Sequence, residues 1–408
     1  MVLNSLLLAG FLKSIGGVLL AILILLAMVT IHEFGHYVAG KILGFKITEF
    51  SVGFGPALFK KRSKKTGEIF ALRVIPLGGY CAFDGEDDFG DGEEKNEEPF
   101  DELSPKMENE GGIVALNAET EPESAYPEPQ GERFNDQAPW KRIIVLIAGA
   151  TMNYLLALGL ILIMFACLGR PMYKVEKFLT AEPTKQTSAQ EVVEPLNTLE
   201  IGDIIKEIDG RDVYMITDYM RVLDGRKKGD VIPVTVMRDG AKRTVFMVLV
   251  ADANIENMTD THNLLTAMGV QQMSTQTQKL GFWETIGDTF TYSIKLAGTV
   301  LRSLGELLTG KLSITAMGGP VTTIKVTAQA SASGLLSFLN VAALIGVNLA
   351  VFNLLPVPAL DGCKVIFCII EWIRKKPVNR KVETIIHLIG IIFLFGFAIL
   401  VDVLQWLL

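Results

Sequence analysis

The sequence contains few cysteines and few histidines for its length. Only four of its 408 residues are cysteine and only four are histidine. No two cysteines have the CxxC spacing, so the sequence predicts neither a disulfide framework nor a metal site built from cysteine pairs. Two of the four histidines, His32 and His36, are only four residues apart.

Positive charge is scarce in one segment of the chain. Residues 84–139 contain nineteen Asp and Glu against three Lys and Arg, whereas the rest contains 26 acidic and 35 basic residues. The segment is rich in Pro and Gly and poor in aromatic residues, so we expect a largely disordered acidic insert without a binding site. The basic balance elsewhere, in so apolar a chain, favours loops facing the cytoplasm over nucleic-acid binding.

Long apolar runs are abundant. Half of all residues are hydrophobic and the mean hydropathy is +0.37. A hydrocarbon layer of about 30 Å needs about 20 apolar helical residues, and the segments 15–37, 143–168, 335–355 and 385–407 meet this need. The first is too long and too polar at its end for a cleavable signal peptide. Residues 282–308 mix aromatic and charged residues and predict an amphipathic interfacial helix.

Basic residues cluster between the first and second predicted spans and between the third and fourth. Because loops rich in Lys and Arg stay in the cytoplasm, we expect a multi-pass protein of the cytoplasmic membrane. Both termini and the region 170–334 are then extracytoplasmic. The basic residues are Lys41, Lys46, Lys60, Lys61, Arg62, Lys64, Lys65, Lys141, Arg142, Arg374, Lys375, Lys376, Arg380 and Lys381.

His32, Glu33 and His36 form an HExxH motif near the end of the first predicted span. Residues four apart lie on one face of a helix, so both imidazoles can bind the same Zn²⁺. Glu33 lies beside them and is placed to act as a general base toward water. A chance match in a soluble helix is the alternative. Ionisable residues are costly in an apolar span unless they have partners, so the motif favours a zinc site at the membrane.

A catalytic zinc ion needs a third protein ligand, and Asp361 is the candidate. It lies in the segment NLLPVPALDG (353–362), after the third span. The two prolines lack N–H donors and interrupt the helix, so an irregular turn can carry the carboxylate back toward the histidines. The charge pattern independently places both segments at the same membrane face. The alternative is that Asp361 only caps the following helix.

The HEFGH and NLLPVPALDG segments resemble those of the bacterial site-2 proteases, a family of intramembrane zinc metalloproteases. The resemblance extends over most of the chain. It implies that His32, His36 and Asp361 bind zinc, and that Glu33 is the catalytic base. The other matching segments are GFGP (53–56), PLGGY (76–80), AGATMN (148–153) and GPV (319–321).

The same resemblance implies substrate-binding residues and a substrate class. Asn348 and Asn353 correspond to two asparagines of the family, which are implied to help position substrate or to steady the site. Such enzymes cut single-span membrane proteins, namely anti-sigma factors already trimmed by an upstream site-1-type protease, or signal peptide remnants. Two positions depart from the family pattern, since Ala150 replaces a usual proline and Cys363 replaces a usual glycine.

Residues 47–54 and 70–76 alternate in polarity and predict a membrane-associated β-hairpin, with Gly78 and Gly79 turning the chain away. A transmembrane helix hides its peptide bonds, so a substrate has to unwind and can add as a strand to the edge of such a hairpin. The alternative is a plain cytoplasmic hairpin.

Residues 171–252 predict a small soluble domain. Residues 201–210 are typical of strand, turn and strand, and 231–237 pairs with 243–250 across an Arg-Asp-Gly turn. The segment resembles a PDZ domain. It can read a carboxylate ligand, exclude large molecules from the site, or serve only as a rigid lid.

We therefore expect a multi-span α-helical membrane protein with four transmembrane helices, a membrane-associated β-hairpin and one extracytoplasmic PDZ-like α/β domain. The expected activity is zinc-dependent endopeptidase cleavage. The expected segments are 1–83 (first span and hairpin), 84–139 (acidic insert), 140–170 (second span), 171–252 (PDZ-like domain), 253–334 (linker and interfacial helix) and 335–408 (third and fourth spans).

Two other functions fit parts of the sequence. A membrane scaffold would hold client proteins through the outer domain without cutting, but it would not need His32, Glu33, His36 and Asp361. A different membrane zinc protease would take a glutamate such as Glu371 as its last ligand. That residue has no second acid at helical spacing.

Overall fold

The structure is a computed structural model that describes residues 2–86, 126–179, 199–257 and 259–407. Most of the predicted acidic insert, residues 87–125, lies outside the described residues. The chain divides into two compact units. The first contains residues 1–156, 320–333 and 345–400, and the second contains residues 157–319, 334–344 and 401–408.

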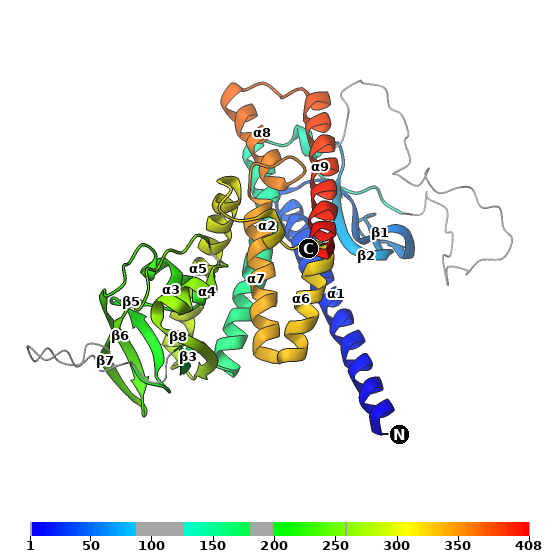
Figure 1. Ribbon diagram of the computed structural model, residues 1–408. Helices are drawn as coiled ribbons and strands as arrows, with labels where there is room; N and C mark the ends of the chain where they lie inside the picture. The colour runs from blue at the N-terminus through cyan, green and yellow to red at the C-terminus, as the bar shows by residue number, and fades with distance from the viewer. Residues whose placement is uncertain (1, 87–125, 180–198, 258, 408) are drawn as a thin grey trace, which may run out of the picture. The chain divides into compact units, whose positions relative to one another are not determined.

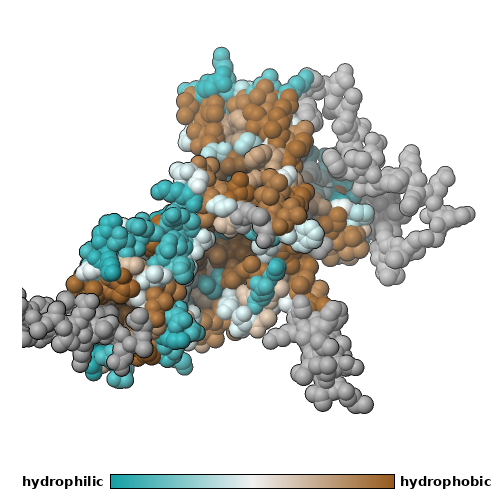
Figure 2. All heavy atoms as spheres, in the orientation of Figure 1, coloured by the Kyte–Doolittle hydropathy of each residue, from teal (hydrophilic) through white to brown (hydrophobic). Residues whose placement is uncertain are grey.

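Within the described residues, four helices are long and apolar enough to cross a membrane. They confirm the four predicted spans, whose ends differ by at most six residues from the candidate spans Ile15–Leu43, Pro139–Cys167, Leu335–Asn353 and Arg380–Leu407. Helix α1 itself begins earlier, at Val2. Large apolar side chains such as Leu388, Ile392 and Phe395 are exposed, and hydrophobic residues cover much of the visible surface over α8 and α9 (Figure 2). Lipid-facing helices expose such side chains. The four are α1 (Val2–Leu43), α2 (Pro139–Cys167), α7 (Leu335–Asn353) and α9 (Arg380–Leu407).

The hairpin of the first unit is formed by β1 (Ile47–Arg62) and β2 (Ile69–Phe83), and it curls on itself. Val52 pairs with Leu72 in the first half of β2 and with Gly79 in the second half. The second half of β2 therefore lies along the opposite side of β1 from the first half. Gly78, at φ +109°, allows the bend between the two halves. A hairpin is present as predicted, but its strands are longer than the expected 47–54 and 70–76. The chain does not turn away at Gly78 and Gly79, because Gly79 pairs with Val52 and the strand continues along β1 to Phe83.

The flank of the acidic insert is folded, whereas residues 84–139 were expected to be largely disordered or loosely attached. Residues 134–136 form a short 3₁₀ helix, η3 (Phe134–Asp136). The ring of Phe134 lies 5.4 Å from the rings of both Phe45 and Phe83, and its side chain is buried. A single buried aromatic residue anchors this part of an otherwise acidic segment, so the composition of the segment as a whole was a poor guide to its end.

Two further helices complete the first unit. α6 (Pro320–Ser333) was not predicted, and it packs beside α1 (Figure 1), where Gly17 leaves room for Ala328 and Ser331. α8 (Asp361–Arg374) begins at the predicted third ligand. The buried Arg142 at the start of α2 donates to Glu371 of α8 at 2.5 Å.

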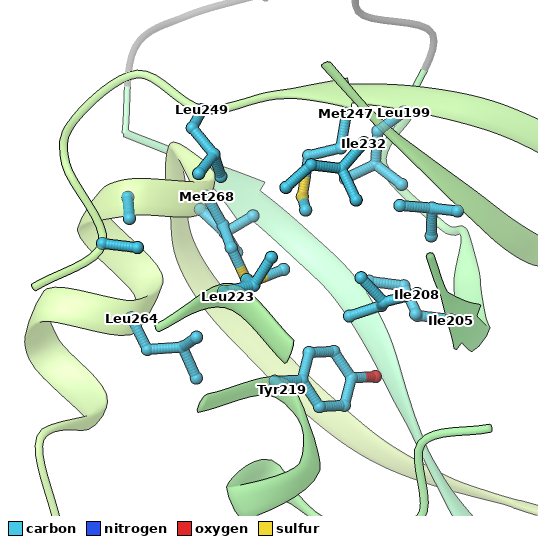
Figure 3. Close-up of a cluster of buried hydrophobic side chains, with 14 of the residues drawn as sticks. Leu199, Ile205, Ile208, Tyr219, Leu223, Ile232, Met247, Leu249, Leu264 and Met268 are labelled. Atoms are coloured by element: carbon cyan, nitrogen blue, oxygen red, sulfur yellow. The ribbon is translucent and has the colours of Figure 1, made fainter. Parts of the chain in front are cut away.

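The second unit contains a six-stranded sheet in the order β7-β6-β4-β3-β8, with β5 beside β4, and every pairing is antiparallel. Its apolar core includes Ile205, Tyr219 and Leu264 (Figure 3). The turn at Asp239 and Gly240, both at positive φ, confirms the predicted hairpin. The elements are β3 (Arg170–Phe178), β4 (Ile204–Ile208), β5 (Arg211–Asp212), α3 (Ile216–Leu223), β6 (Val231–Arg238), β7 (Ala241–Val248), α4 (Thr261–Met268) and β8 (Val270–Gln278).

This domain is longer than the expected 171–252. β8 pairs with β3 along most of its length, and Leu264 and Met268 of α4 are buried in the same core. The amphipathic helix predicted over 282–308 is present as α5 (Phe282–Leu308), followed by a short 3₁₀ helix, η4 (Ile314–Ala316). Much of the segment expected to be a linker is therefore regular structure.

Candidate metal centre

His32, His36 and Asp361 converge in the first unit. The two histidines lie one turn apart on α1, and Asp361 is the first residue of α8. His32 Nε2 and His36 Nε2 are 3.2 Å apart, and Asp361 Oδ2 lies 3.1 Å from the former and 3.4 Å from the latter. Both histidines are buried. Residues separated by more than 320 positions thus present three donor atoms to one point.

The three distances fit one tetrahedral ion. Ligand atoms about 2.0–2.1 Å from a tetrahedral zinc ion lie about 3.3 Å from one another, which is the observed spacing. Asp361 Oδ2 is buried, yet it accepts no well-directed hydrogen bond from any residue that the structure describes. A buried carboxylate oxygen normally has a partner. Two imidazole nitrogens and one carboxylate therefore form a donor set that suits a divalent ion.

Helix α2 supports the imidazoles from the side. His36 Nδ1–H donates to the Val145 carbonyl oxygen at 2.8 Å. This bond fixes the tautomer, because a carbonyl can only accept, and it leaves the lone pair of Nε2 directed at the centre.

Asn153 plays the corresponding part for His32. Its amide Nδ2 lies 3.3 Å from His32 Nδ1. Its Oδ1 is buried without a partner among the described residues. A half-turn of the amide would let Oδ1 accept from Nδ1–H and leave His32 Nε2 for a metal.

Gly149 of α2 lies directly against both imidazoles. A Cβ at this position would be 2.3 Å from His36 Nε2 and 2.8 Å from His32 Cε1. Gly35, between the histidines, has no room for a Cβ either, since one would lie 2.5 Å from the Ala148 carbonyl oxygen. Glycines therefore let α1 and α2 approach closely at the centre.

The hairpin passes beside Glu33. A Cβ at Gly79 would lie 3.3 Å from Glu33 Cγ and 2.8 Å from the Ser51 carbonyl oxygen. Gly79 begins the second half of β2, which pairs with β1 on one side, while no described strand pairs with its other side. An open strand edge thus lies close to the proposed base.

The two predicted asparagines differ in position. Asn353, the last residue of α7, places Nδ2 3.5 Å from both ring nitrogens of His32. Asn348 lies five residues earlier on the same helix with an exposed side chain. Glu371, the alternative ligand, is engaged by Arg142 and by Arg380, the latter at 3.5 Å. It is thus paired with cations rather than placed in the donor set.

The sequence interpretation did not assign roles to Gly149, Asn153 or the Val145 carbonyl. Asn153 carries a usable signal, because a polar side chain inside an apolar span is costly and suggests a functional partner. Gly149 lies in the family-like segment AGATMN (148–153), but that likeness assigns it no role. Val145 carries no signal, because the contact of α2 with α1 is a tertiary feature.

Candidate membrane spans with an HExxH helix and a converging aspartate define a membrane metalloprotease. The family model described as peptidase family M50 matches residues 20–397, and the chain belongs to this family.

Relatives align over nearly the whole chain. The zinc metalloprotease RasP of Bacillus licheniformis is 27% identical over 418 residues, covering 91% of this chain and 94% of the relative. A putative zinc metalloprotease of Fusobacterium nucleatum is 28% identical over 385 residues, covering 94% and 97%. One from Clostridium perfringens is 29% identical over 392 residues, covering 95% and 97%.

Proposed function

We propose that the chain is an intramembrane zinc metalloprotease that hydrolyses single-span membrane proteins. The observation that carries the proposal is the convergence of His32 Nε2, His36 Nε2 and Asp361 Oδ2 at tetrahedral spacing. The centre lies near the end of a candidate span, with Glu33 next in sequence to His32. Membership of peptidase family M50 and relatives named zinc metalloproteases support the same function.

In this proposal the two imidazoles and the carboxylate hold the ion. When bound, zinc supplies the Lewis acidity that makes water nucleophilic near neutral pH and stabilises negative charge on the scissile carbonyl oxygen. Glu33 takes the proton from the attacking water and returns it to the leaving amine. Val145 and Asn153 hold the imidazoles in the tautomers that present Nε2. The Asn353 amide, 3.5 Å from His32, is placed to donate to substrate.

Substrate binds as an extended strand at the open edge of β2. A helical substrate satisfies its own backbone groups and hides its peptide bonds. The edge beside Gly79 offers backbone partners to an unwound segment, close to Glu33. Exposed Asn348 on α7 is proposed to contact the same segment.

The substrate class and the orientation follow from the resemblance and from the charge pattern. Substrates are trimmed anti-sigma factors or signal peptide remnants, delivered after an upstream protease has removed their outer domains. The termini and the PDZ-like domain are extracytoplasmic, and the domain excludes bulky proteins or reads a new carboxylate end. The alternative, a scaffold that no longer cuts, leaves the converged donor set without a purpose.

Two variants of the purified full-length protein test the proposal in detergent, with a single-span model substrate. Glu33→Gln removes the base but no ligand, so zinc should stay near one equivalent while cleavage falls by at least about 100-fold. Asp361→Ala removes a ligand, so both zinc content and cleavage should fall. Zinc is measured by elemental analysis and cleavage by gel.

The two variants also separate the parts of the proposal. Undiminished cleavage by Glu33→Gln would remove that residue from the base role. A full equivalent of zinc in Asp361→Ala would remove the aspartate from the ligand set.

A further inference from the structure

The turn that carries Asp361 adopts an unusual backbone conformation. Residues 354–360 connect α7 to α8, and Ala359 lies two positions before Asp361 with φ at +79°. A Cβ disfavours this left-handed region, which glycine adopts freely. Gly362 crowds the same turn, since a Cβ there would lie 2.3 Å from the Leu355 carbonyl oxygen. Something outside the turn has to keep Ala359 in this conformation.

Helix α9 makes the two contacts that do so. His387 Nδ1 accepts a hydrogen bond from the Ala359 N–H at 3.1 Å. One turn later, Gly390 lies against Pro358, where a Cβ would be 2.4 Å from Pro358 Cβ and 2.6 Å from its carbonyl oxygen. The ring of Phe367 on α8 meets the His387 imidazole edge-on at 6.0 Å. His387 thus lies between the turn and the helix that Asp361 begins.

We propose that His387 is a positioning residue for Asp361, acting through the backbone of Ala359. The hydrogen bond stabilises the left-handed conformation, and the close approach of Gly390 keeps the turn against α9. Without the bond, Ala359 relaxes toward negative φ and the following residues turn with it. A rotation of this size two residues before Asp361 displaces its carboxylate by more than the roughly 0.5 Å that a binding constellation tolerates.

The inference rests on the proposed ligand role of Asp361, and it adds a residue of helix α9 to the groups that hold the metal centre. A positioning role for His387 differs from a role in packing alone in one testable respect. If the imidazole only fills space, the conformation preferred by residue 359 is irrelevant to metal binding. If it holds the turn, replacing Ala359 with glycine should make the turn less dependent on it.

The experiment measures zinc affinity of the full-length protein in detergent by competition with a chelator. His387→Leu keeps the bulk but has no acceptor, and it should lower affinity by about 10- to 100-fold, as loss of an outer-shell partner does. His387→Asn keeps an acceptor at the δ position and should stay within a few-fold of the parent. Adding Ala359→Gly to His387→Leu should restore a large part of the loss, because glycine has no preference against positive φ.

A matched pair of glycines on α9 provides a second measurement that does not depend on the folding of His387→Leu. The methyl group of Gly390→Ala would press on Pro358, so this variant should have a lower zinc affinity. Gly396→Ala should not, because beyond the backbone of its own helix no described atom lies within 4 Å of the added Cβ. The absorption of the Co²⁺-loaded protein should change in Gly390→Ala and in His387→Leu but not in Gly396→Ala.

Each outcome has one reading. Parental affinity in His387→Leu overturns the inference, whatever Gly390→Ala shows, and so does a loss in His387→Leu that Ala359→Gly leaves unchanged. Asp361→Ala is measured alongside. If Asp361→Ala keeps its zinc, the proposed ligand set is wrong. If Asp361→Ala loses zinc but His387→Leu and Gly390→Ala keep it, only the positioning role is wrong.

Discussion

At the scale of single residues, the metal centre depends on side chains that are missing as much as on those that are present. Gly35 and Gly149 leave the space in which α1 and α2 meet, and a Cβ at either would overlap atoms of the other helix. In a membrane, close helix approach of this kind depends on small residues. The histidines of α1 can therefore pack against α2 only because residues 35 and 149 are glycine; a larger side chain at either position would keep the two helices apart.

Gly149→Ala should empty the metal centre without unfolding the protein. The added methyl group would lie 2.3 Å from His36 Nε2, on the atom proposed to bind zinc. We expect zinc affinity to fall by at least about ten-fold and cleavage to fall with it, although alanine is the better helix former by up to about 1 kcal/mol. Chelator competition and thermal unfolding measure the two effects.

Gly159→Ala is the matched control, since it lies on the same helix with no described atom within 4 Å of its Cβ position. It should leave zinc affinity unchanged. Equal affinity in the two variants would mean that α2 can move away from the histidines at little cost.

The chemistry-bearing residues could be predicted from the sequence, and their supports could not. The i,i+4 spacing fixes that His32 and His36 share a helix face, and the cost of charge in an apolar span makes them conspicuous. Asp361 stands out because two prolines precede it. Gly149 lies in the family-like segment AGATMN, but that likeness assigns it no role. The Val145 carbonyl and His387 act through contacts between segments far apart in the sequence, and no local pattern marks such contacts.

At the scale of elements, α5 belongs to the domain built on the six-stranded sheet rather than to a loose linker. Asp288 of α5 accepts from Arg170 of β3 at 2.9 Å and from the Tyr214 hydroxyl at 3.0 Å. Two turns later, Lys295 donates to Asp218 at 3.0 Å and lies 4.5 Å from the centre of the Tyr214 ring. The helix therefore contacts β3, the loop between β5 and α3, and the first turn of α3.

Two buried tyrosines of this domain should respond in opposite ways to loss of the hydroxyl. Tyr214→Phe removes only the bond to Asp288 and keeps the ring, so it should destabilise the domain by about 1.5–3 kcal/mol, as expected for a charged acceptor. Tyr219→Phe should be neutral or stabilise by up to about 1 kcal/mol. The Tyr219 hydroxyl is fully buried and has no partner among the described residues (Figure 3).

Hydrogen exchange in peptides covering 211–225 of the full-length protein reports these free energies of opening. A Tyr214→Phe variant as well protected as the parent would show that α5 is not held through that hydroxyl.

The helices and strands agree with the sequence-based prediction where the residues of the element themselves carry a clear pattern. The four spans and α5 have continuous apolar or amphipathic patterns, and all five formed where expected. β8 was not anticipated, because its polar sequence VQQMSTQTQ becomes a strand by pairing with β3 almost a hundred residues earlier. α6 was missed because β-branched and small residues give it no clear helical pattern.

At the scale of the whole molecule, the four spans constrain which loops share a side of the membrane. The six-stranded sheet domain lies between the second and third candidate spans in sequence, and the basic loop 374–381 lies between the third and fourth. If α7 crosses the bilayer, these two regions have to be on opposite sides, whatever the absolute orientation. In the proposed orientation the basic loop is cytoplasmic and the domain is outside, because loops rich in Lys and Arg stay in the cytoplasm.

Labelling of single cysteines tests this arrangement in intact cells. The background carries Cys167→Ser, because Cys167 is exposed while Cys81, Cys363 and Cys368 are buried. Arg243→Cys, on an exposed site of β7, should react with an impermeant maleimide without permeabilisation, and Lys376→Cys should react only after it. The reverse pattern would invert the protein in the membrane. Reaction of both positions from one side would mean that α7 does not cross, and the metal centre at its end would then need a different route to a membrane-embedded peptide bond.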